Sequence, residues 1–122
     1  MKNIIIESAG GKIELKVEPL DNPTSRKISS SLPIESRAET WGDEIYFDTG
    51  IAASASGGTL DVDVGDIAYW PEGKCLCIFF GRTPASSGEK PAPASEVVIV
   101  GKARLNPESL RRVKPGSKIR VS

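Results

Sequence analysis

The sequence predicts a mainly β protein folded as a single domain over residues 1–122, and three observations lead to this prediction. Apolar and charged residues alternate in segments such as KIELKVE at 12–18, which is the pattern of a strand with one buried face. Short segments of this kind recur between Gly, Pro and Asp residues, which commonly bound strands. The length of 122 residues suits one hydrophobic core. We therefore expect an all-β barrel or sandwich.

The strand candidates are short and follow one another closely. Residues 3–7 and 12–18 are expected to form an opening hairpin, joined by the segment Ser8-Ala9-Gly10-Gly11. Each later candidate is bounded by turn residues, as in other all-β folds. The remaining strands are expected at residues 34–40, 44–48, 60–64, 66–70, 75–81, 96–103 and 117–121.

Two segments predict short helices. Each starts with an Asn-Pro pair, at residues 22–23 and 106–107, which supplies an N-cap and a proline suited to the first helical position. Apolar residues at helical spacing follow, and Pro33 and Pro115 mark the ends of the two segments. We expect helices of this length to cover open ends of a barrel.

The charge distribution argues against some partners. Lys plus Arg and Asp plus Glu both total 16, so no net field attracts nucleic acid or an anionic membrane. Every charged residue of segment 35–72 except Arg37 is acidic, and every charged residue of segment 102–122 except Glu108 is basic. We expect these segments to be solvated or to pair with each other.

The N-terminal segment MKNIII contains too short an apolar run for a signal peptide or a membrane span. We therefore expect a cytoplasmic protein.

The composition also argues against several chemistries. The chain has no histidine, which excludes Ser-His-Asp hydrolysis, Cys-His thiol chemistry and His-ligated metals. Cys75 and Cys77 are its two cysteines, too few for a structural zinc site, so we expect them to be buried apolar residues. The pair Gly57-Gly58 lacks the lysine of a P-loop. We therefore expect no metal and no cofactor.

The strand expected at residues 75–81 is unusual because neither of its faces carries a polar residue. Cys75, Cys77 and Phe79 would point to one side, and the residues between them to the other. One face belongs to the barrel interior, and something should cover the second. Two coverings remain open: the protein itself, through a helix or the loop expected at 83–95, or a ligand in a groove on the outer surface.

A candidate groove can be assembled around this strand. Trp41 and Trp70 stand at strand ends beside turns, where a large aromatic side chain either walls a shallow site or covers the core. Glu44 and Tyr46 share one strand face, which is either part of a site or an ordinary exposed face. Arg82 directly follows the apolar strand and can meet a carboxylate. The candidate ligand-binding residues are Trp41, Glu44, Tyr46, Trp70, Phe80 and Arg82.

Three longer motifs resemble the small prokaryotic cyclophilin-like proteins. They are WGDEIYF at 41–47, GDIAYWPEGKCLCIFFGRTPAS at 65–86 and SEVVIVGKA at 95–103. The resemblance implies a closed eight-stranded barrel capped by two helices, with a peptide groove on the outer surface. Isomerase cyclophilins carry a Phe-His-Arg segment whose arginine stabilises the twisted imide. The nearest counterpart here, IYF at 45–47, has neither His nor Arg, so efficient prolyl isomerase activity is not expected.

Three functions are consistent with these features. The first is a binding domain whose outer groove takes a peptide or a small organic ligand. The second is a peptidyl-prolyl cis-trans isomerase with a rearranged site, in which Arg82 or Arg37 replaces the missing arginine. The third is a homo-oligomeric assembly module, in which the apolar strand or the oppositely charged segments meet between chains.

Overall fold

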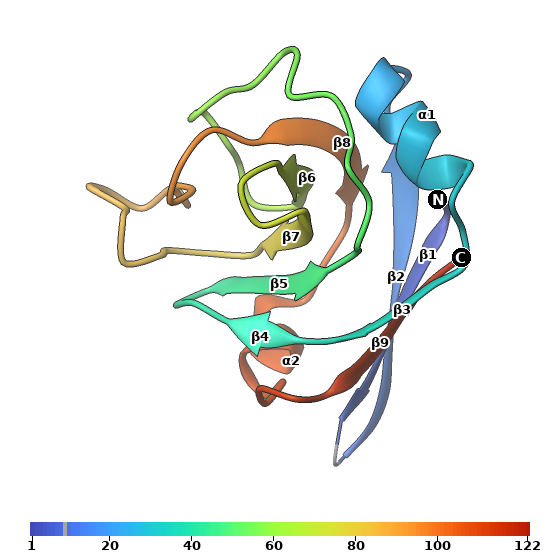
Figure 1. The fold of residues 1–122 in the computed structure, drawn as a ribbon. Helices are drawn as coiled ribbons and strands as arrows, with labels where there is room; N and C mark the ends of the chain where they lie inside the picture. The colour runs from blue at the N-terminus through green and yellow to red at the C-terminus, as the bar shows by residue number, and fades with distance from the viewer. Residues whose placement is uncertain (9) are drawn as a thin grey trace.

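In the computed structural model, residues 1–8 and 10–122 are described and form a nearly closed antiparallel β-barrel with two short helices (Figure 1). Ala9, in the predicted turn of the opening hairpin, lies outside the described residues. The elements are β1 (Asn3–Ser8), β2 (Gly11–Pro19), α1 (Pro23–Ser29), β3 (Ile34–Arg37), β4 (Glu39–Thr40), β5 (Glu44–Asp48), β6 (Asp66–Trp70), β7 (Cys75–Phe79), β8 (Val98–Ala103), α2 (Pro107–Arg111) and β9 (Lys118–Val121).

The strand order leaves one seam in the barrel. Neighbours pair in the order β3-β9-β1-β2-β8-β6-β7-β5-β4, so β3 and β4 are the two edges of the sheet. These edge strands are consecutive in the chain and only Ala38 separates them. The Ala38 N–H donates to the Ser117 carbonyl at 2.8 Å, and the Gly116 N–H donates to the Ala38 carbonyl at 2.8 Å. The chain itself joins the edges, and no ladder between β3 and β4 closes the barrel among the described strands.

The expectation of a closed barrel of eight strands is therefore wrong in both respects. The described residues form nine strands, and the strand predicted at 34–40 divides at Ala38 into β3 and β4. The segment predicted as a strand at 60–64 is irregular. There the Asp63 N–H donates to Oδ2 of Asp66 at 2.8 Å, and this side-chain contact stabilises a turn in place of a strand ladder.

Both predicted helices are present and begin at the predicted caps. Oδ1 of Asn22 accepts a hydrogen bond from the Ser25 N–H at 2.8 Å, and Oδ1 of Asn106 accepts one from the Glu108 N–H at 3.1 Å. The Asn22 amide also donates to the Ile99 carbonyl at 3.0 Å, which attaches α1 to β8. The two helices lie well apart on the barrel (Figure 1).

Strand β7 is buried on both faces. Leu76 and Ile78 point into the main core inside the barrel, whereas Cys77 and Phe79 belong to a second, smaller cluster outside it. The chain itself covers most of this outer face, through the segments that precede β6 and β8. The residues of the second cluster are Val62, Ala68, Cys77, Phe79 and Val97.

Ion pairs join the acidic and basic segments of the chain. Each of these pairs links an acid between residues 35 and 72 to a base of segment 102–122. They are Arg111 with Asp43, Lys102 with Asp66, and Arg120 with Glu35. Pairing within the fold therefore accounts for part of the charge asymmetry of the sequence.

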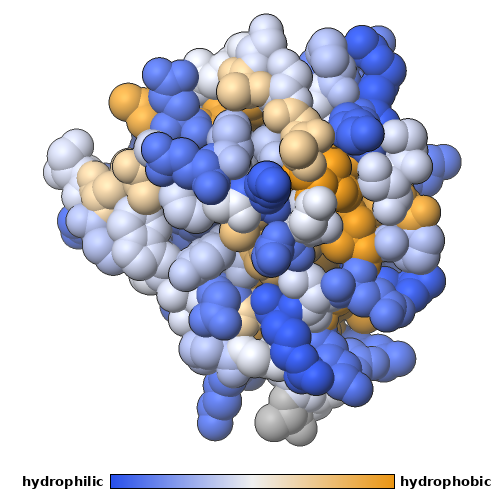
Figure 2. Space-filling view, viewed as in Figure 1, coloured by the Kyte–Doolittle hydropathy of each residue, from blue (hydrophilic) through white to orange (hydrophobic). Residues whose placement is uncertain are grey.

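The surface in the orientation of Figure 2 is mostly hydrophilic, and hydrophobic residues gather beside α1. Residues such as Leu32 and Ile51 are partly buried and pack against the main core. Among the described residues, neither helix has the length and apolar character needed to cross a membrane.

The double burial of β7 has a direct consequence for stability. Phe79 is fully buried in the outer cluster, so Phe79→Ala should lower the free energy of unfolding by about 3–5 kcal/mol. Leu60, which is 62% exposed, provides the control. Leu60→Ala should change the free energy of unfolding by less than about 0.5 kcal/mol. Urea unfolding measures both. A Phe79→Ala effect as small as that of the control would show that the outer face of β7 is not covered in solution.

Candidate functional site

The β4–β5 hairpin places three candidate residues on the outer face of the barrel. Gly42 has φ +59°, the conformation required at the first central position of a type II′ turn. The Trp41 N–H donates to the Glu44 carbonyl at 2.9 Å, so Trp41 and Glu44 form a directly opposed pair. Tyr46 lies two residues after Glu44 and therefore shares its face. The tight turn thus brings an indole, a carboxyl group and a phenol together.

The turn is itself fixed in place by its neighbours. The Arg111 guanidinium donates from Nε to Oδ2 of Asp43 at 3.1 Å, which joins the turn to α2. The Asp43 N–H donates to the Arg82 carbonyl at 2.8 Å. A Cβ atom at Gly42 would lie 2.9 Å from the same carbonyl oxygen, so only glycine allows this close approach. The position of Trp41 and Glu44 is therefore set by the fold and not by the hairpin alone.

Trp70 supplies the opposite wall of the site. It ends β6, and its indole Nε1 donates to Oγ of Ser95 at 2.6 Å. The Ser95 hydroxyl donates in turn to Oε2 of Glu72 at 3.0 Å. Gly73 lies against the ring, because a Cβ atom at this position would be 2.5 Å from Cζ3 of Trp70. The ring is thus held both at its edge and through its only polar atom.

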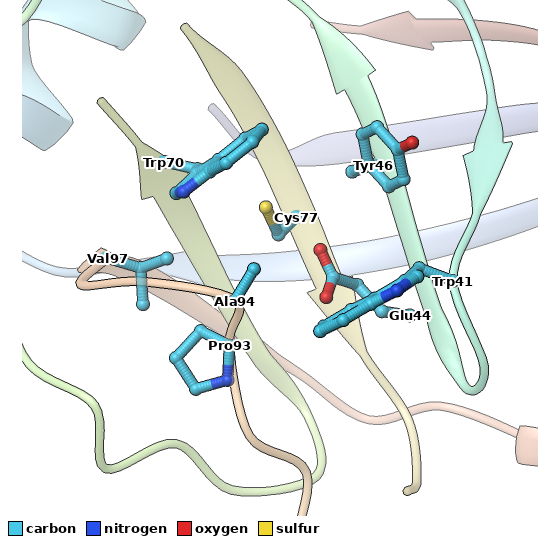
Figure 3. A pocket seen from close by; sticks show the side chains of 8 residues that line it. All are labelled: Trp41, Glu44, Tyr46, Trp70, Cys77, Pro93, Ala94 and Val97. Carbon is cyan, nitrogen blue, oxygen red and sulfur yellow. The ribbon is translucent and has the colours of Figure 1, made fainter. Parts of the chain in front are cut away.

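Cys77 forms the floor between these walls. In the sheet register it stands opposite Tyr46 of β5 on one side and Ala68 of β6 on the other. The small Ala68 side chain leaves space above the floor. The result is a pocket of about 210 Å³, open to the surface (Figure 3). Its lining residues are Trp41, Glu44, Tyr46, Trp70, Cys77, Pro93, Ala94 and Val97.

The pocket contains four of the six candidate ligand-binding residues: Trp41, Glu44, Tyr46 and Trp70. Phe80 is only 2% exposed and lies in the main core, so it does not line the pocket. Arg82 is exposed and is not among the lining residues either.

Sequence reasoning left out four lining residues. Cys77 could have been predicted, because this residue shares a strand face with Phe79 and stands opposite Tyr46 when β5 and β7 pair. The loop expected at 83–95 was one of the two coverings left open for β7, but no pattern in the sequence indicated that Pro93, Ala94 and Val97 would be the residues that reach the site.

The two thiols are unsuited to nucleophilic chemistry. Both Cys75 and Cys77 are free and buried. Burial is the main cause that raises the pKa of Cys75 to about 11, and nearby Asp48 and Glu44 add to the effect. Burial likewise raises the pKa of Cys77 well above its ordinary value. Both groups are therefore protonated thiols at neutral pH.

Glu44 has the most unusual environment in the site. It is 6% exposed, and its Oε1 is buried without a hydrogen-bond partner in the described part of the chain. Loss of solvation raises the pKa of its carboxyl group to about 7, and the adjacent Cys77 thiol partly opposes this shift. In Figure 3 the carboxyl group lies between Trp41 and Cys77. At neutral pH it is thus divided between acid and carboxylate.

The charges around the pocket are acidic. Glu39 stands directly opposite Tyr46 in the β4–β5 pair, and Asp48 follows on the same face of β5. The Glu39 and Glu44 charges both raise the pKa of the Tyr46 phenol, although burial is the larger cause. No lysine or arginine is among the lining residues. Within the described residues, no group of three or more Cys, Asp or Glu side chains is placed to hold a metal ion.

The raised pKa of Glu44 should appear as a pH dependence of stability. The folded state holds a proton that the unfolded chain releases above its ordinary pKa of 4.5. The free energy of unfolding should therefore fall as the pH rises from about 4.5 to 7, by up to about 3 kcal/mol. Glu44→Gln keeps the shape of the side chain but removes this pH-dependent part of the free energy of unfolding. Urea unfolding of the wild type and the variant between pH 4.5 and 7 measures the difference. Parallel curves of stability against pH would contradict the raised pKa of Glu44.

The contact between Gly73 and Trp70 can be tested separately. Gly73→Ala should displace the Trp70 ring and cost about 1–3 kcal/mol, because the new methyl group overlaps the indole. The NMR signal of the Trp70 indole N–H should shift as its bond to Ser95 is disturbed. Gly88→Ala is the control, since a Cβ atom there meets nothing within 4 Å. Equal, small spectral changes in both variants would show that Trp70 is not held against Gly73.

Comparisons with known proteins agree on the fold. The solution structure of a hypothetical protein from Archaeoglobus fulgidus is 36% identical, over 99% of this chain and 93% of the archaeal chain, with a TM-score of 0.75. A structure of McbB in complex with tryptophan has a TM-score of 0.61 over 96% of this chain and 43% of McbB. At 14% identity that likeness concerns the fold alone. No curated protein matches significantly.

The family comparison covers almost the whole chain. The profile of the family described as Cyclophilin-like matches residues 2–122. The match includes the β4–β5 hairpin, β6, β7 and the 83–95 loop, so every element of the pocket lies within it. Together with the archaeal structure, this shows that the chain belongs to the Cyclophilin-like family.

Proposed function

We propose that this protein is a ligand-binding domain that holds a short peptide segment or a small organic molecule in the pocket between Trp41 and Trp70. One observation carries the proposal: a carboxyl group with an unpartnered buried oxygen lines an apolar pocket with three aromatic side chains. Binding pockets generally combine apolar walls with a few placed polar groups. A buried polar atom without a partner costs stability unless something else satisfies it.

The pocket is largely formed in advance. Trp70 is held by Ser95 and Gly73, and the turn that carries Trp41 is held by Arg111. The walls are already ordered before a ligand binds, so binding would cost little further conformational entropy, and this favours affinity. The volume of about 210 Å³ lies below the roughly 300–1,000 Å³ typical of drug-sized ligands. A single side chain or head group suits this space.

The alternative functions have weaker support. The isomerase hypothesis places Arg82 or Arg37 where the missing arginine would stabilise the twisted imide. Arg37 is on β3 and donates to the Gly116 carbonyl at 3.0 Å, and neither it nor Arg82 lines the pocket. The assembly module stays a prediction, and no observation of the described residues favours it over the binding domain.

A fragment screen followed by NMR shift mapping tests the proposal. The set should include tryptophan, the molecule named in the McbB complex, and short proline-containing peptides. We expect shifts to cluster on the signals of Trp41, Tyr46 and Trp70. Trp70→Ala should weaken binding by about fivefold or more, since stacked aromatic contacts are worth about 1 kcal/mol or above. Leu60 is highly exposed and does not line the pocket, so Leu60→Ala should leave the affinity unchanged. If no tested ligand shifts the signals of these three residues as a group, this site is ruled out.

A further inference from the structure

We propose that the ligand carries an alkylated ammonium group, which binds between the Glu44 carboxylate and the side chains of Trp41, Tyr46 and Trp70. The inference rests on the proposed binding function and adds the chemical class of the ligand. It depends on three features: a carboxyl group that the protein leaves unpartnered, the aromatic walls around it, and the sign of the surrounding charge.

The first feature is the isolation of Glu44. Acidic side chains this deeply buried are normally paired with a base or receive several N–H donors. Glu44 has neither an ion pair nor a hydrogen-bonded N–H group in the described part of the chain, and the neighbour that acts on its carboxyl group is the weakly donating Cys77 thiol. A cation in the pocket would supply the missing countercharge and stabilise the carboxylate.

The second feature is the nature of the walls. The faces of aromatic rings carry partial negative charge and attract cations, most strongly in Trp. Two indoles and one phenol line this pocket, and Figure 3 shows Trp41 and Trp70 on opposite sides of Cys77, with Tyr46 on a third side. The indole N–H of Trp70 is already bonded to Ser95, so this ring offers the pocket no free donor. An anionic ligand would meet ring electrons and a carboxylate, and is therefore disfavoured.

The third feature is the charge around the opening. Glu39 and Asp48 lie on the same outer face as Tyr46, and neither has an ion-pair partner among the described residues. In contrast, Asp43 in the adjacent turn is neutralised by Arg111. The acids that remain uncompensated near the pocket would attract a cation and repel an anion.

The walls also select among cations. A primary ammonium has three N–H donors and a guanidinium has five, and each buried donor needs an acceptor. The lining side chains offer only the Glu44 carboxylate and the Tyr46 hydroxyl as good acceptors, while Pro93, Ala94 and Val97 close the remaining side with apolar groups. An ammonium whose hydrogens are replaced by alkyl groups leaves no donor unsatisfied and presents methyl groups to these walls. The small volume fits a head group of this size.

Three probes separate the contribution of charge from that of the methyl groups. Choline carries a trimethylammonium group, 3,3-dimethylbutan-1-ol has the same shape without the charge, and ethanolamine keeps the charge without the methyl groups. Each is titrated into the protein at neutral pH while the signals of the pocket residues are followed by NMR. We expect choline to bind at least about tenfold more tightly than either other probe. Glu44→Gln should reduce the advantage of choline over the neutral alcohol to the part that the aromatic rings supply, whereas Glu18→Gln, a change at an exposed acid outside the pocket, should keep it in full.

The outcomes distinguish this inference from the proposed function. If the neutral alcohol binds as tightly as choline, the pocket is a binding site but the cationic class is wrong. If ethanolamine binds as tightly as choline, selection for alkylation is overturned. If choline produces no shifts at the pocket, the inference fails as well, and the fragment screen decides independently whether the pocket binds other molecules.

Discussion

The burial of β7 on both faces is the constraint on which the rest of this structure depends. A barrel strand normally needs only one apolar face, but Cys77 and Phe79 on the outer face of β7 also require cover. Val62 and Val97 provide it over Phe79, from segments that precede β6 and β8. Over Cys77 the cover is incomplete, because its neighbour Ala68 is small. The pocket is the part of the outer face that the chain leaves unfilled.

This arrangement explains why an acid is buried at the edge of the pocket. Glu44 stands opposite Phe79 in the β5–β7 ladder, so the same cover that buries Phe79 removes water from the carboxyl group. Desolvation then opposes ionisation, and no N–H group of the described chain compensates. Natural proteins tolerate such local costs chiefly where a ligand or a reaction makes use of them. Glu44 therefore affects both the stability of the free protein and the charge of the pocket.

Much of the candidate site was predictable because it depends on contacts between near neighbours in the chain. The turn Trp41-Gly42-Asp43-Glu44 places Trp41 and Glu44 opposite each other, and alternation along β5 adds Tyr46. Trp70 followed from its place at the end of a strand. Phe80 and Arg82 do not line the pocket. Alternation along 75–81 itself puts Phe80 on the same face as Leu76 and Ile78, and this face enters the main core.

The mainly β character, the opening hairpin, both capped helices and the family could be predicted from the sequence, because alternation, capping and turn chemistry act over a few residues. The nine strands of the described residues, the seam of the barrel at Ala38 and the irregular path of residues 60–64 beside Asp66 became known only from the folded structure. The same is true of the place of Pro93 and Ala94 in the pocket. These features depend on the register between distant strands and on how loops return over them, and no pattern along the chain encodes such contacts locally.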